Sequence, residues 1–175
     1  MQPDQASFLL NAVFLPSVKR ESHTTRAVIG AVPLDQSGYR PDTISKTALE
    51  LSWHIAASEM RFIDSVIAGT FDMTPRPKPE SIQTSADLVA WYSENLDSRL
   101  TQLAQVTPEQ LTTVIDFRGL MQMPAVMFLN MMLHHSVHHR GQLSTYLRPM
   151  GAKVPAIYGE SYDTALARKA QQTAS

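Results

Sequence analysis

The sequence predicts an all-α protein, an antiparallel four-helix bundle with long loops and a short C-terminal extension. Apolar residues recur at helical spacing in four segments, and clusters of turn-forming residues separate these segments. We identify no period-two alternation that would predict a ladder of strands. The chain has 175 residues. Because one domain usually has ~100–200 residues, we expect a single domain, 1–175.

The first helix is expected over residues 17–31. No proline interrupts this segment, its residues tolerate a helix, and Pro33 follows it. The residues before Pro16 are expected to add a short helical extension. The turn-forming residues of segment 35–42, which include a glycine and a proline, then predict a loop.

The second helix, expected from Ser45 or Thr47 to about Gly69, has a clear helical pattern. Thr47 and Glu50 have the spacing of a capping box, in which each side chain accepts a hydrogen bond from the backbone of the other. The apolar stripe of this helix consists of Leu51, Ile55, Phe62 and Val66. His54 lies beside the stripe, so we expect its imidazole to face the interior of the bundle.

Three prolines in segment 70–83 predict an extended surface loop, because each proline lacks a backbone N–H and restricts the residue before it. Thr84 and Asp87 then mark the start of a third helix, which we expect to end near Val106. Residues 111–123 are ambiguous.

The last long helix is expected from Pro124, a favourable residue in a first helical turn, to about Pro149. In segment 151–175 we expect a loop at residues 155–159 and a terminal helix from about Asp163. This tail is expected to pack over one end of the bundle.

Charge and hydropathy restrict the possible partners. Lys and Arg number 15 and Asp and Glu number 16, which leaves a formal net charge of -1 and no basic field for nucleic acid or an anionic membrane. No run reaches the ~18–20 apolar residues of a membrane span. Segment 8–15 lacks the basic start and the cleavage site of a signal peptide. We expect a soluble cytoplasmic protein that takes a small-molecule substrate and binds neither nucleic acid nor a membrane.

Histidine is the leading candidate for a metal ligand, because the chain has no cysteine. The last helix carries two His-x-x-x-His pairs, formed by His134, His135, His138 and His139. Residues four apart point the same way on a helix. With ~100° per residue, the apolar side of this helix lies within about 80° of His135 and also contains His139. The residues that define this side are Phe128, Met132, Leu143 and Tyr146.

His54, His135 and His139 together predict a three-histidine metal site. A single histidine on an apolar stripe is more often an ordinary core residue, but a pair four residues apart facing a third favours a metal. Three protein ligands leave one or more positions for water or substrate. His134 and His138 are expected to be solvated at the edge of the helix.

The segment 135–143, with the sequence HSVHHRGQL, resembles the H-x-x-H-H-R-G-Q signature of the DinB family of DNA-damage-inducible proteins, which are DinB/YfiT-like metalloenzymes. Further segments follow the family's order and spacing. These segments are 21–33, 39–42 (YRPD), 51–56 (LSWHIA) and 155–159 (PAIYG). The resemblance covers most of the chain, and no ligand position departs from it.

The resemblance implies a four-helix bundle, commonly a homodimer, in which one histidine of the second helix and two of the last helix bind zinc or nickel. These positions are His54, His135 and His139, and no other cofactor is implied. Gly141 is expected to let a neighbouring helix approach. The adjacent Arg140 and Gln142 are expected to bond to another helix or to support a ligand.

No catalytic residue is predicted. Glu21 and Glu59 lie on inner helices and are candidates to orient a ligand histidine, although a carboxylate is more often solvated. Tyr158, in the loop after the last helix, is a candidate to cover the mouth of the site. His23 is expected to be exposed.

Characterised members of the superfamily resemble thiol-dependent transferases and isomerases, in which a low-molecular-weight thiol such as bacillithiol or mycothiol meets the metal. The resemblance therefore implies a thiol-dependent S-transferase. A metal-dependent hydrolase, which activates water at the same position, is an alternative. A non-catalytic metal-binding stress protein is another. DNA binding, suggested only by the family's name, is disfavoured by the charge balance.

Overall fold

The computed structural model describes residues 1–173 and is mostly helical, which confirms this part of the predicted fold class. Its helices are α1 (Pro3–Phe8), α2 (Leu15–Gly30), α3 (Ala48–Ala68), α4 (Ser85–Leu103), α5 (Pro108–Thr112), α6 (Met127–Leu147) and α7 (Tyr162–Thr173). Other elements are a π-helical segment (Leu9–Phe14), a 3-10 turn (Leu34–Gln36) and the strands β1 (Val114–Phe117) and β2 (Met121–Pro124).

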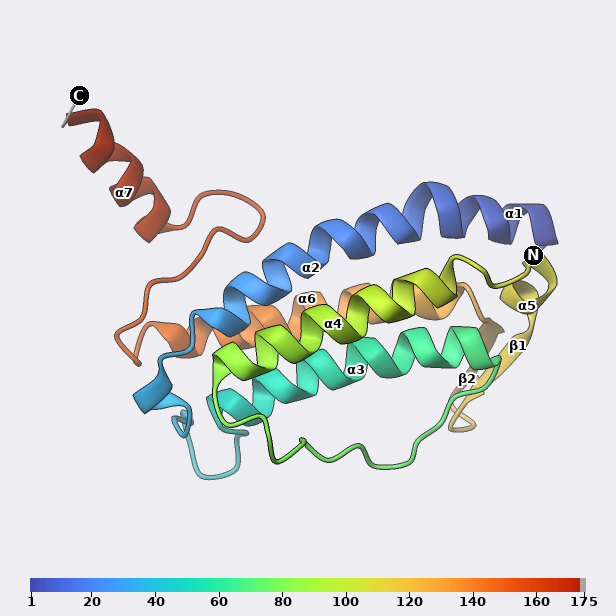
Figure 1. The fold of residues 1–175 in the computed structure, drawn as a ribbon, viewed down its shortest axis with the longest axis horizontal. Helices are drawn as coiled ribbons and strands as arrows, with labels where there is room; N and C mark the ends of the chain where they lie inside the picture. The colour runs from blue at the N-terminus through green and yellow to red at the C-terminus, as the bar shows by residue number, and fades with distance from the viewer. Residues whose placement is uncertain (174–175) are drawn as a thin grey trace.

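The long helices α2, α3, α4 and α6 lie side by side (Figure 1). Both α2 and α3 pack against α4 and α6. The predicted antiparallel order holds only in part. Helices α3 and α4 run in the same direction, because the loop 70–84 leads the chain back along the length of α3 before α4 begins (Figure 1). Each long helix therefore contacts one parallel and one antiparallel neighbour.

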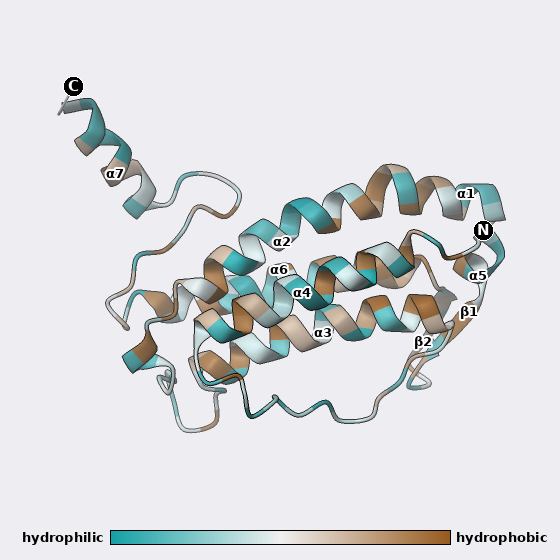
Figure 2. Cartoon of the chain, in the orientation of Figure 1, coloured by the Kyte–Doolittle hydropathy of each residue, from teal (hydrophilic) through white to brown (hydrophobic). Residues whose placement is uncertain are grey.

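Apolar side chains fill the space between these helices. Each long helix carries both hydrophobic and hydrophilic residues, as expected for helices with one face in a core (Figure 2). The four stripe residues predicted for α3 are all buried, as are Leu96 of α4 and Phe128 and Leu143 of α6. None of the described helices is both long and apolar enough to span a membrane.

Capping interactions set the ends of α3 and α4 where the sequence predicts them. Glu50 N donates to Thr47 Oγ1 at 3.2 Å, and Thr47 N donates to Glu50 Oε2 at 2.7 Å. Thr84 and Asp87 form the same capping box at α4. At the other end of α3, Gly69 has a φ of 69°, in the left-handed region that favours glycine. Both predicted helix starts are confirmed.

The helical extension expected before Pro16 is present as α1 and the π-helical segment, and the helix continues through Pro16 into α2. Pro16 lies in the first turn of α2, and the π-helical segment directly precedes it. A proline lacks a backbone N–H, and its ring crowds the preceding turn of an α-helix. The wider π-helical turn accommodates the ring, so the helix continues.

Residues 111–123 contain a hairpin that the sequence analysis missed. Strands β1 and β2 pair antiparallel, with Val114 opposite Pro124. Arg118 and Gly119 form the turn, with φ values of 61° and 68°. Each strand has 4 residues, which is too short for its alternation to stand out from a helical pattern. Pro124, expected to begin the last helix, instead ends β2.

The C-terminal tail does not pack as expected. The predicted terminal helix is present as α7, but no residue in the described part of α7 is buried. It projects away from the four long helices (Figure 1). Asp163, in the first turn of α7, connects this helix to the preceding segment: its carboxylate accepts hydrogen bonds from Arg148 Nη1 at 3.0 Å and from Val154 N at 2.8 Å. Hydrophilic residues occur along much of this helix (Figure 2), and none of its apolar residues is buried.

We predict that Thr47→Ala lowers the free energy of unfolding by about 1 kcal/mol, because it removes one half of the capping box at α3. Urea unfolding followed by circular dichroism measures this change. Thr101→Ala is the matched control: Thr101 is exposed near the end of α4, and its replacement is expected to change stability by less than about 0.5 kcal/mol. Equal effects of the two substitutions would contradict the assigned role of Thr47.

Candidate metal centre

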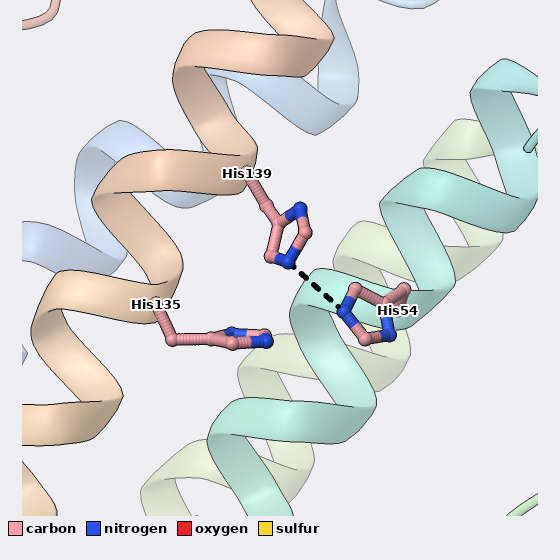
Figure 3. Close-up of side chains that lie close together, drawn as sticks. All are labelled: His54, His135 and His139. Atoms are coloured by element: carbon pink, nitrogen blue, oxygen red, sulfur yellow. Dashed lines mark hydrogen bonds between the residues drawn. The ribbon is translucent and has the colours of Figure 1, made fainter. Parts of the chain in front are cut away.

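Three histidines from two helices meet at one point. His54 comes from α3, and His135 and His139 come from α6, and their rings point toward one another (Figure 3). One nitrogen from each lies within 4.8 Å of the other two. His54 Nε2 and His139 Nε2 are 3.1 Å apart. The sequence prediction that these three residues lie together is confirmed.

Local helical geometry and the packing of α3 on α6 produce this cluster. His135 and His139 are four residues apart, so their side chains share the face of α6 that lies against α3. The apolar neighbours on that face, Met132 and Leu143, are buried. His54 lies on α3 beside the buried Leu51 and Ile55 and therefore meets the pair across the helix interface.

The environment keeps these imidazoles neutral. All three rings are half-buried. Burial, and then the proximity of His139, lowers the pKa of His54 to about 4. Burial, and then the nearby His139 and His54, lowers the pKa of His135 to about 4. Burial also lowers the pKa of His139. A neutral imidazole has a free lone pair, which is the form that binds a metal ion.

The nitrogen spacing fits a shared ion. Two nitrogens bound to one zinc at ~2.0–2.1 Å are about 3.3 Å apart at a tetrahedral angle, close to the 3.1 Å between His54 Nε2 and His139 Nε2. His139 Nδ1 is 3.0 Å from Gln142 Oε1, which orients the ring and leaves Nε2 for a ligand. His135 Nδ1 is buried and has no such partner within residues 1–173.

Among the described residues, no carboxylate and no fourth histidine joins the cluster. A structural zinc site usually has four protein ligands, whereas a catalytic site has three and keeps a position open. A cavity of about 920 Å³ opens beside His54 and His135. Its walls include the aromatic rings of Phe62, Phe71 and Phe117. An ion held by the three histidines would therefore face a space large enough for a small organic molecule.

Arg140, Gly141 and Gln142, which follow His139 in the signature, make different contacts. Gln142 supports His139, as the sequence analysis allowed. Arg140 is fully buried, and its Nη1 donates to the backbone oxygen of Glu21 on α2 at 2.8 Å. Gly141, expected to permit a close helix approach, faces open space, since a Cβ there would meet no atom within 4 Å. That expectation is wrong.

The carboxylates proposed to orient a histidine do not do so. Glu21 forms an ion pair with Arg140 and accepts a hydrogen bond from Tyr158 at 2.7 Å. Glu59 accepts hydrogen bonds from Tyr92 and Thr25 inside the core, and burial raises its pKa. Both candidates were placed on inner helices correctly, but their partners lie on other helices or in the loop after α6, which a single-helix pattern does not reveal.

Tyr158 does not cover the mouth of the site. Its hydroxyl accepts from Arg140 Nη2 at 2.7 Å, and it is not among the residues that line the cavity. His134, His138 and His23 are exposed, as predicted.

Comparison with known proteins agrees with the signature. The family model described as DinB family matches residues 5–172. The uncharacterized Bacillus subtilis protein YrdA is 27% identical over 150 residues, which cover 83% of this chain and 86% of YrdA. The uncharacterized YjoA of the same species is 27% identical over 131 residues, which cover 74% of this chain and 83% of YjoA.

Solved structures show the same fold. A DinB-like protein from Bacillus cereus superposes with a TM-score of 0.69 at 26% identity, over 83% of this chain and 95% of that protein. The crystal structure of YjoA superposes with a TM-score of 0.64 at 24% identity, over 81% of this chain and 94% of that one. The match over nearly the whole sequence, together with the signature on α6, shows that the chain belongs to the DinB family.

Proposed function

We propose that this protein is a metal-dependent enzyme in which His54, His135 and His139 hold one divalent ion inside a single-domain four-helix bundle. The observation that carries the proposal is the convergence of three neutral imidazoles, of which His54 and His135 line a cavity. A purely structural ion would need a fourth protein ligand, and none joins the cluster in the described chain. This favours an enzyme over a non-catalytic metal-binding protein.

Zinc and nickel are the ions that we propose. Three imidazoles form a borderline ligand set that suits zinc, copper, iron and nickel, whereas magnesium and calcium prefer oxygen ligands. Family membership also favours a metal at this position.

The proposed reaction is the transfer of an external low-molecular-weight thiol to a small electrophile. When bound, an ion at this place would favour the thiolate form of a coordinated thiol or lower the pKa of a coordinated water. The chain itself has no cysteine, so the thiol must come from a second molecule. The half-buried histidines stay unprotonated at neutral pH, and Phe62, Phe71 and Phe117 give the cavity an aromatic surface.

Two features of the proposal rest on the family alone. These are the identity of the thiol, for which bacillithiol and mycothiol are the candidates, and assembly as a homodimer.

We predict that the purified protein contains about one zinc or nickel ion per chain, and that His135→Ala and His139→Ala abolish metal retention. His134→Ala and His138→Ala are the matched controls, since they lie on the same helix but are exposed. Elemental analysis of the four variants measures the outcome. Metal retained after His139→Ala would show that the ligand set is wrong.

We predict that Gln142→Ala weakens metal affinity by about 10–100-fold, because His139 loses the acceptor that orients its ring. Gln142→Glu keeps an acceptor oxygen at this position and is expected to retain most of the affinity. Competition with a chromophoric chelator measures both constants. Gln102→Ala, at an exposed position of α4, serves as the control, and a loss of affinity there would point to general destabilisation.

We predict that the absorption spectrum of the cobalt-substituted protein changes when bacillithiol, mycothiol or glutathione is added at millimolar concentration, because a thiolate ligand would enter the open position. Metal-dependent consumption of the thiol with a panel of electrophiles then tests turnover. If the spectrum does not respond to any of the three thiols, the transferase proposal fails, and a water-activating hydrolase becomes the better explanation of the site.

A further inference from the structure

The cavity beside the histidines is strongly cationic. Six basic side chains line it: Arg40, Lys46, Arg61, Arg76, Lys78 and Arg118. The only carboxylate in its described lining is Glu50. The whole chain has 15 Lys and Arg residues and a net charge of -1. A large share of the positive charge of a nearly neutral protein is therefore gathered at one cavity.

Most of these basic side chains form no ion pair among the described residues. Glu50 is already engaged by the backbone of Thr47 in the capping box. Arg76 forms an ion pair with Asp64 at 2.6 Å. The other five basic residues have no ion pair in the part of the chain that the structure describes, and Arg61 donates only to the carbonyl oxygen of Thr74 at 2.8 Å.

Arg61 and Lys46 lie on either side of the histidine cluster along α3. Arg61 follows His54 by seven residues, which is two helical turns on the same face, or about 10 Å along the axis. Lys46 lies just before the start of α3. Both side chains line the cavity together with His54. Arg61 is half-buried, which strengthens its interaction with a bound anion.

Part of the cavity wall is aromatic. The ring centroids of Phe62 and Phe71 are 5.3 Å apart, and those of Phe71 and Phe117 are 4.7 Å apart. Phe62 also contacts His135, with ring centroids at 5.8 Å. The cavity therefore combines an aromatic surface, the histidine cluster and a group of unpaired cations.

We propose that the molecule bound in this cavity is an organic anion whose carboxylate or phosphate group is held by Arg61, within a positive field to which Lys46 contributes. Its apolar part packs on the aromatic wall, and its reactive end reaches the histidine cluster. The position of the reactive end rests on the proposed function, whereas the anion site does not. A guanidinium binds a carboxylate or phosphate through two parallel hydrogen bonds, and a cationic cavity raises the local concentration of anions.

Calorimetry on the full-length protein, with its metal content measured in each sample, tests this inference. The probes are phenyl phosphate, phenylacetate and the neutral 2-phenylethanol. Both anions are expected to bind roughly tenfold or more tightly than the alcohol, because only they pair with the cations. The anion that binds with the higher affinity shows whether the site prefers phosphate or carboxylate.

Substitutions separate the cations from the metal. Arg61→Gln is expected to weaken anion binding roughly tenfold without changing metal content, and Arg61→Lys to retain part of the affinity. Lys46→Gln is expected to weaken binding by less than Arg61→Gln, because Lys46 adds only to the positive field of the cavity. Lys46 is exposed and makes no hydrogen bond within the described residues, so its variant stays informative if Arg61→Gln loosens the loop at Thr74. The controls are Arg20→Gln and Lys169→Gln, which lie outside the cavity.

Two results would separate this inference from the proposed function. If metal is present but the Arg61 and Lys46 variants bind the anions as the original protein does, the ion alone attracts them and the inference is overturned. If the protein retains no metal while anion binding still depends on Arg61 and Lys46, the anion site stands and the metal-dependent function falls.

Discussion

The contact between α3 and α6 is the constraint on which the site depends. It brings His54 to His135 and His139, which are 81 and 85 residues away in the sequence. Each helix contributes an apolar face on both sides of its histidines, so the hydrophobic effect that drives the packing also brings the three imidazoles together. The burial that results keeps the rings neutral. Packing, protonation state and metal-binding capacity thus have a common physical origin.

A buried polar network holds the register of these helices. Arg140 of α6 bonds to Glu21 and Thr25 of α2, and Thr25 donates to Glu59 of α3, which also accepts from Tyr92 of α4. All four long helices are therefore linked. Removing one member of a buried ion pair typically costs about 3–5 kcal/mol. Such bonds have strict geometry, so the network disfavours sliding of α6 along α3, which would separate the histidines.

Local features of the sequence were enough to predict the long helices and the inward-facing positions of the three histidines. Capping at Thr47 and Thr84 depends on residues three apart, and the shared face of His135 and His139 depends on residues four apart. Both follow from the geometry of a single helix. Gln142 was recognised only as part of the family signature, and its hydrogen bond to His139 appears once side chains are placed.

The sequence by itself thus determined the helical pattern, the family and the three histidines, because these are recorded in short-range spacing. Only the tertiary structure decided how α3 and α4 are oriented, that segment 114–124 pairs as a hairpin, and that α7 stands apart. It also decided the charge of the cavity, where residues from several loops converge although the chain as a whole is nearly neutral. The hairpin joins strands that are near in the sequence but too short to show an alternating pattern. The other features depend on contacts, or on the lack of contacts, between distant segments, which short-range spacing does not record.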